Sequence, residues 1–332
     1  MQQKENILLS VEDLTVEYTS NKQVVHAVNG VSFKVERGKC LCLVGETGAG
    51  KTTIAKSILR ILPTPQGRIV SGSISFDGKD VVKMKENELM DVRGSDISMI
   101  FQDPMTALNP LMTVGEQVAE VIELHYPELS PAEIRDKATE MLGLVGITRE
   151  RYHDYPHQFS GGMKQRVVIA IALACRPRLL LADEPTTALD VTLQSQILDL
   201  IRELQQERET AMIFITHDLG VVAEISDYVA IVYAGQIVEY GPREKIFRNP
   251  THPYTIGLIY SLPEMNIGKA RLECISGVSS DPVNLPEGCY FHPRCAYATD
   301  ECRSGTIPLG EVSDGHFCRC CNRKEEQPCL QF

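Results

Sequence analysis

The chain has 332 residues, with 33 basic and 44 acidic side chains, and its formal net charge of -11 argues against a basic nucleic-acid-binding surface. Hydrophobic residues make up 43% and charged residues 23%, which excludes general disorder and allows one large α/β domain with an appendage. The longest apolar run, residues 167–175, is too short to span a bilayer, and residues 1–10 lack the features of a secretion signal. We therefore expect a chain that stays in the cytosol.

The first quarter of the chain predicts strands, then a glycine-rich loop and a helix. Residues 7–38 contain short β-rich runs typical of an antiparallel sheet, and residues 39–44, which are apolar after Lys39, predict a buried strand. After the loop, residues 52–62 have the apolar spacing of a helix that ends before Pro63. Strand character returns at residues 68–82.

The middle of the chain is predicted to be helical. Residues 130–147 carry a start signal, with Ser130 as the N-cap, Pro131 at the first helical position and Glu133 completing a capping box. Further elements are expected as a helix after Gly162, a strand at 179–182, a helix at 192–207, a strand at 211–217 and a hairpin at 228–241. Strands that alternate with helices predict a mostly parallel sheet with a helical insert.

Two stretches predict a nucleotide site. Residues 45–52, GETGAGKT, fit the pattern G-x-x-x-x-G-K-[ST], in which glycines let backbone N–H groups surround a phosphate. Lys51 would reach the β- and γ-phosphates, and the Thr52 hydroxyl would hold Mg²⁺. The apolar run LLLA then delivers Asp183 to the sheet edge as a Mg²⁺ ligand, and Glu184 beside it could polarise the attacking water.

At this point the sequence resembles the ABC ATPases. Residues 159–166, FSGGMKQR, are similar to the signature motif of that family, although Phe159 stands where leucine is more usual. Gln102 resembles the Q-loop glutamine, Asp190 the D-loop aspartate and His217 the switch histidine. The order and spacing of these motifs match over residues 7–245.

The resemblance implies a P-loop ABC ATPase fold, with a mostly parallel sheet, an antiparallel β subdomain and a helical insert. It places this nucleotide-binding domain at residues 1–250, with a helical signature subdomain at about 103–175. It implies catalytic roles for Glu184 and His217, and Mg²⁺ ligation by Thr52, Gln102 and Asp183. The residues it assigns to ATP are Tyr18, which would stack on adenine, with Gly45, Glu46, Thr47, Gly48, Ala49, Gly50, Lys51, Thr52, Thr53, Ser160, Gly161, Gly162 and Asp190.

Two further stretches resemble the ATPase subunits of dipeptide and oligopeptide importers. They are QDPMTALNPLMTVGEQ after Gln102 and NPTHPYTIGLIYSLP at residues 249–263. This resemblance implies an ATPase that energises peptide import from the cytoplasmic face of the membrane. Its partners would be two integral-membrane permease subunits, a homologous ATPase or a second copy of the chain, and indirectly an extracytoplasmic substrate-binding protein, with no nucleic acid. Importers of nickel or other small solutes, and soluble ABC ATPases outside transport, remain alternatives.

Seven of the 11 cysteines lie in the last ~45 residues of the chain, within a predicted irregular accessory domain at residues 251–332. Cys289, Cys295, Cys302 and Cys320 form no tight C-x-x-C pair among themselves, so they suit a [4Fe–4S] cluster at least as well as Zn²⁺, and unliganded thiols remain a third reading. The importer resemblance implies a cluster held by Cys289, Cys295, Cys302 and Cys320. Its GH-x-x-x-C frame selects Cys320 over Cys318 as the fourth ligand.

Overall fold

A computed structural model of the chain describes residues 6–20, 23–186, 190–266 and 274–321. The chain divides into two compact units. The first unit comprises Met1–Leu8, Val35–Lys39 and Lys83–Phe214. The second unit comprises Leu9–Lys34, Cys40–Val82 and Ile215–Phe332.

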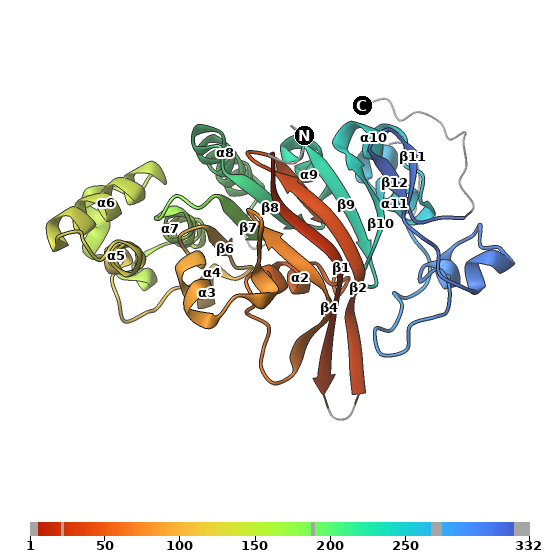
Figure 1. Cartoon of the computed structure of the whole chain (residues 1–332). Coiled ribbons are helices and arrows are strands. Elements are labelled where there is room, and N and C mark those ends of the chain that lie inside the picture. The colour runs from red at the N-terminus through yellow and green to blue at the C-terminus, as the bar shows by residue number, and fades with distance from the viewer. Residues whose placement is uncertain (1–5, 21–22, 187–189, 267–273, 322–332) are drawn as a thin grey trace. The chain divides into compact units, whose positions relative to one another are not determined.

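An antiparallel sheet of the second unit contains the early strands (Figure 1). Its strand order is β2-β1-β4-β5, formed by β1 (Ile7–Ser20), β2 (Gln23–Glu36), β4 (Gly67–Phe76) and β5 (Lys79–Asp80). Strands β1 and β4 run antiparallel from the pair Leu9–Phe76 to the pair Tyr18–Gly67. The predicted antiparallel sheet is confirmed, whereas the strand expected at residues 68–82 ends at Phe76 and is followed by β5 and a short 3₁₀ turn.

A second group of strands in this unit has the order β11-β12-β10-β9-β3. The strands are β3 (Cys40–Val44), β9 (Tyr228–Tyr233), β10 (Gln236–Pro242), β11 (Gly310–Ser313) and β12 (His316–Cys318). Strand β3 is buried at every residue and pairs in parallel with β9, as its apolar sequence predicts. The helices of this unit are α2 (Lys51–Ile58), α9 (Leu219–Ile225), α10 (Arg243–Arg248) and α11 (Pro253–Tyr260).

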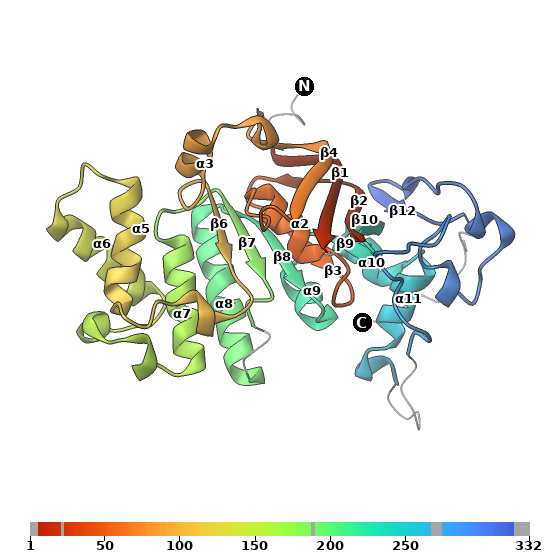
Figure 2. The same ribbon diagram turned by 90° about the horizontal axis from the view of Figure 1, so that it is seen from below.

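The first unit combines parallel strands with the helical insert (Figure 2). Its strand order is β8-β7-β6, formed by β6 (Ile97–Ile100), β7 (Leu179–Asp183) and β8 (Ala211–Thr216), of which the last two residues belong to the second unit. Its helices are α3 (Glu86–Val92), α4 (Pro104–Ala107), α5 (Val114–His125), α6 (Pro131–Leu144), α7 (Gly161–Leu173) and α8 (Val191–Arg208). In the insert α5 packs against both α6 and α7.

Helix starts in the insert follow the sequence closely. Ser130 caps α6, its Oγ accepts the Glu133 N–H at 3.4 Å, and the Glu133 carboxylate accepts the Ser130 N–H at 2.8 Å, as predicted. Strand β6, with the sequence ISMI, has no counterpart among the predicted elements, because four residues are too few to show a pattern that identifies a strand. In the part of the chain that the structure describes, no helix is both long and apolar enough to cross a membrane.

Candidate nucleotide site and cysteine cavity

The loop between β3 and α2 is built so that only glycine fits at two of its positions. A Cβ at Gly45 would lie 2.1 Å from the carbonyl oxygen of Val232, on the neighbouring strand β9. Gly50 has a φ of 100°, and a Cβ there would lie 2.3 Å from the carbonyl oxygen of Ala27. The glycines of the predicted phosphate pattern are therefore required by the backbone itself.

Helix α2 begins at Lys51, directly after this loop. The Lys51 side chain is 5% exposed, and its Nζ donates to the carbonyl oxygens of Gly45 at 2.7 Å and Glu46 at 3.0 Å. Thr52 and Thr53 occupy the first turn, where the positive end of the helix dipole favours an anion. The Tyr18 hydroxyl lies 3.3 Å from Thr53 Oγ1, so the predicted adenine-stacking residue adjoins the loop.

The first unit brings the predicted catalytic residue Glu184 together with the predicted Mg²⁺ ligands Asp183 and Gln102 at the end of β7. Asp183, the last residue of the strand, is 2% exposed. Glu184 follows with a φ of 46°, a left-handed conformation that is strained for a residue with a side chain. Its Oε2 accepts a hydrogen bond from Gln102 Nε2 at 3.0 Å. Gln102 and Glu184, 82 residues apart, thus contact each other.

The signature residues form the N-terminus of α7. Ser160 caps the helix, and its Oγ accepts the Met163 N–H at 3.4 Å. Gly161 is exposed, and a Cβ placed there would meet no atom within 4 Å. A Cβ at Gly162, in contrast, would lie 3.0 Å from the side chain of Leu193 in α8.

The remaining predicted residues lie next to the ends of other helices and strands. Asp190 precedes α8, and its Oδ1 accepts the Leu193 N–H at 3.0 Å, so the signature and D-loop residues meet around Leu193. His217 is exposed directly after β8. Phe159, the departure from the usual signature, is buried, with the guanidinium carbon of Arg151 4.1 Å from its ring centroid.

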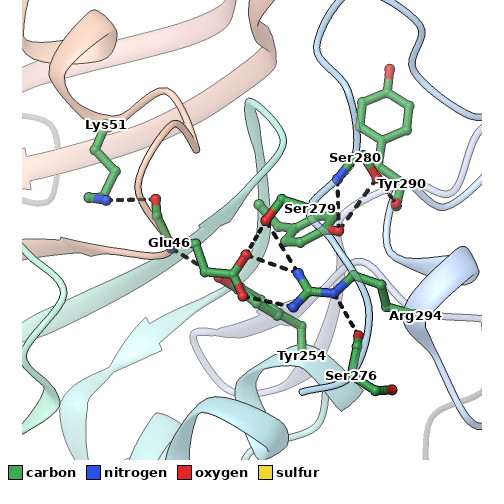
Figure 3. Close-up of polar contacts among 9 residues, drawn as sticks. Glu46, Lys51, Tyr254, Ser276, Ser279, Ser280, Tyr290 and Arg294 are labelled. Carbon is green, nitrogen blue, oxygen red and sulfur yellow. Dashed lines mark hydrogen bonds and ion pairs between the residues drawn. The ribbon is translucent and has the colours of Figure 1, made fainter. Parts of the chain in front are cut away.

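A contact that the sequence analysis missed holds the second residue of the phosphate loop. The Glu46 carboxylate accepts from both terminal nitrogens of Arg294, at 2.9 and 3.0 Å, and it also bonds Ser279 (Figure 3). Burial by itself raises the pKa of Glu46, but the hydrogen bonds from Arg294 and Ser279 and the charges of Arg294 and Lys51 outweigh it and lower the pKa below its usual value. No sequence signal links residues 248 positions apart.

The four predicted cluster ligands border one small cavity in the second unit. Its lining includes Cys289, Cys295, Cys302 and Cys320, together with Cys321, His252 and His292. Cys318 does not line it and lies in β12 opposite Glu239. Burial raises the pKa of the Cys289 thiol to about 11. Within the described segments, no three His, Cys, Asp or Glu side chains are arranged to hold a metal ion.

The thiols fit a four-cysteine ligand set in number and type, because all four face one cavity. Cys320 borders this cavity and Cys318 does not.

Comparison with protein-family models gives two matches along this chain. Residues 28–187 match the model described as ABC transporter, and residues 238–302 match the model described as Oligopeptide/dipeptide transporter, C-terminal region. The second match contains Tyr254 and Arg294.

Curated relatives match almost the whole chain. The oligopeptide transport ATP-binding protein OppD of Bacillus subtilis is 48% identical over 313 residues, which cover 93% of this chain and 87% of the relative. The dipeptide transport ATP-binding protein DppD of the same organism is 49% identical, with 94% of each chain covered. OppD of Salmonella typhimurium is 47% identical, with 98% of this chain and 96% of the relative covered.

Solved structures match about seven tenths of the chain. The dimeric ATP-binding cassette MJ0796, in a post-hydrolysis state with ADP and Pi, superposes with a TM-score of 0.64 at 27% identity and covers 71% of this chain and 98% of its own. The ABC transporter component cbiO1 of Clostridium perfringens gives a TM-score of 0.63 at 31% identity, with 73% and 91% covered.

Proposed function

This chain belongs to the family of ABC transporter ATP-binding proteins that serve oligopeptide and dipeptide transport, and we propose how its residues hydrolyse ATP to drive peptide import. The observation that carries the proposal is the loop from Gly45 to Thr53. Its glycines exclude any side chain, its lysine is turned inward, and it opens a helix whose N-terminus favours phosphate.

Lys51 and the loop N–H groups would bind the β- and γ-phosphates, and Tyr18 would stack on adenine. Mg²⁺ would be held by the Thr52 hydroxyl and by Asp183 and Gln102, where it would neutralise charge on the phosphates. We assign Glu184 as the group that orients and polarises the attacking water. His217 would hydrogen-bond the γ-phosphate. The strained backbone of Glu184 supports its assignment, since such strain is often kept at functional sites.

A second ATPase chain would supply Ser160, Gly161 and Gly162 to the same nucleotide. The exposure of Ser160 and the open space around Gly161 support this assignment, because a partner's phosphate could approach the first N–H groups of α7. Asp190, next to these residues through Leu193, would lie at the same interface. This second chain would be a homologous ATPase or another copy of this one.

The domain and partner assignments extend the same proposal. Residues 1–250 would form the nucleotide-binding domain, with its helical subdomain at about 103–175. Closure of the ATPase pair would drive a conformational change in two permease subunits in the membrane. An extracytoplasmic binding protein would supply the peptide. The chain would then work as a peripheral subunit at the cytoplasmic face of the membrane.

ATP hydrolysis by the purified full chain tests the nucleotide site. The rate per chain should rise with protein concentration, because each site needs residues of a second chain. Glu184→Gln should bind ATP as the unchanged chain does and lose at least ~100-fold in turnover. Lys51→Ala should lose binding itself. Near-normal hydrolysis by Glu184→Gln would remove that residue from the catalytic role.

For residues 251–332 we propose an accessory domain that holds a [4Fe–4S] cluster through Cys289, Cys295, Cys302 and Cys320. The shared cavity and the exclusion of Cys318 from it support the proposal. Such a cluster would stabilise the fold of a segment that has few strands and helices of its own.

Anaerobic purification with iron, sulfide and zinc analysis tests this assignment. About four irons per chain and a broad absorption band are expected, with loss of iron in Cys320→Ser and full iron in Cys318→Ser. One zinc per chain, or no metal at all, would refute the cluster while leaving the ATPase assignment intact.

A further inference from the structure

The phosphate loop carries an acidic residue where negative charge opposes its function. Glu46 follows Gly45 directly, and its main-chain oxygen accepts from the Lys51 ammonium. An unpaired carboxylate at this position would repel a triphosphate and would also compete for Lys51. The chain therefore needs something to neutralise Glu46.

Arg294 supplies that charge in a fixed orientation (Figure 3). Its Nη1 and Nη2 donate to the two oxygens of the Glu46 carboxylate at 2.9 and 3.0 Å, a bidentate pair. Its Nε donates to the carbonyl oxygen of Ser276 at 3.0 Å, and the Arg294 side chain is only 6% exposed. The guanidinium is thus held on both sides rather than extended into solvent.

Aromatic rings also pack near the guanidinium of Arg294. Its guanidinium carbon lies 5.8 Å from the ring centroid of Tyr233 and 5.9 Å from that of Phe291. These two rings pack edge to face at 5.3 Å, and Tyr254 packs against both. A rigid aromatic cluster therefore fixes the position from which Arg294 reaches the loop.

The main chain of Glu46 is held from the same side. Its N–H donates to the Tyr254 hydroxyl at 3.1 Å, and Tyr254 lies in the first turn of α11. Within the second unit, segments more than 200 residues downstream thus hold both the side chain and the backbone of one phosphate-loop residue.

We propose that Arg294 is a positioning residue of the nucleotide site, which neutralises and orients Glu46 so that the phosphate loop accepts the polyanion. The inference deepens the proposed function and rests on it, since it takes Gly45–Thr53 as the ATP site. Arg294 itself acts through Glu46. Loss of the arginine therefore harms binding mainly because it leaves the Glu46 carboxylate uncompensated.

Nucleotide affinity of the full chain tests this proposal, measured with the non-hydrolysable analogue AMPPNP and with ADP. Arg294→Ala should weaken AMPPNP binding about tenfold at low ionic strength, with a smaller loss for the less charged ADP. Added salt should reduce the loss of AMPPNP affinity in Arg294→Ala, since salt screens an uncompensated charge near the surface. Arg294→Lys, which keeps the charge without the bidentate geometry, should lose about threefold.

A second substitution separates electrostatics from simple loss of structure. Adding Glu46→Gln to Arg294→Ala removes the uncompensated charge and should restore most of the lost affinity, although it restores no contact. Arg303→Ala is the matched control, because Arg303 is an exposed arginine of the same segment. Thermal melting of each variant checks that the fold persists.

The possible outcomes distinguish this inference from the site on which it rests. The role of Arg294 would be overturned if Arg294→Ala bound AMPPNP within twofold of the unchanged chain. It would also be overturned if the double variant bound AMPPNP no better than Arg294→Ala alone. Absence of AMPPNP binding in the unchanged chain, or binding that survives Lys51→Ala, would overturn the nucleotide site instead.

Discussion

Glu239 in β10 is the residue whose replacement should most weaken the attachment of the C-terminal segment. Its side chain is fully buried, and its carboxylate accepts the N–H groups of Thr251 at 2.7 Å and His252 at 2.9 Å. His316 Nε2 in β12 lies 2.7 Å from Glu239 Oε1. One carboxylate therefore connects three separate parts of the second unit.

The loss of stability in Glu239→Ala follows from the hydrogen-bond donors that would be left without an acceptor. Two backbone N–H groups and one imidazole lose their acceptor in a site that water does not reach. Removal of one partner of a buried charged network typically costs 3–5 kcal/mol, so we expect a loss of about 4 kcal/mol in the free energy of unfolding. Glu239→Gln keeps one carbonyl oxygen but turns an NH₂ group toward a donor, and should cost about half as much.

Urea unfolding of the full chain measures the total loss, and hydrogen exchange at Thr251 and His252 shows where it arises. The matched control is Glu287→Ala, which removes an exposed glutamate of the same segment and should change stability by less than ~0.5 kcal/mol. A loss below ~1 kcal/mol in Glu239→Ala, with exchange at the two amides unchanged, would refute the reasoning.

Three further predictions concern single side chains. Gly45→Ala should abolish ATP binding, measured by titration, because its Cβ would lie 2.1 Å from the Val232 oxygen; binding within tenfold of the unchanged chain would contradict this. Phe159→Leu should cost only about 1 kcal/mol in urea unfolding, since it keeps an apolar side chain and loses mainly the Arg151 contact, and a loss above ~3 kcal/mol would show a larger role. Burial raises the pKa of Cys175 to about 11, so about one thiol in a thousand is ionised at pH 8, and alkylation there should need unfolding or a pH near 11; rapid labelling of the folded chain at pH 8 would argue against this.

Features that depend on residues close together in the sequence were predictable, whereas contacts between distant segments were not. The phosphate loop and the Ser130 cap follow from spacings of a few residues, and backbone geometry enforces both. The Glu46–Arg294 pair joins residues 248 positions apart, and a charged residue has many possible partners in a chain with 33 basic side chains. The HPYT stretch at residues 252–255 carries part of the importer resemblance, but the resemblance does not reveal that His252 caps α11 or that the Tyr254 hydroxyl accepts the Glu46 N–H of the phosphate loop.

The position of a strand end explains why two neighbouring cysteines differ. Cys318 is the last residue of β12 and pairs with Glu239 on one side and Gly310 on the other, so its backbone is fixed within the sheet and its side chain is buried. Cys320 follows Arg319, whose guanidinium donates to the carbonyl oxygens of Ile237 and Ile307. Those bonds hold the chain just past the strand, where Cys320 borders the cysteine cavity. Spacing alone makes the two thiols equivalent, and only the end of the strand separates the cysteine that belongs to the sheet from the one that borders the cavity.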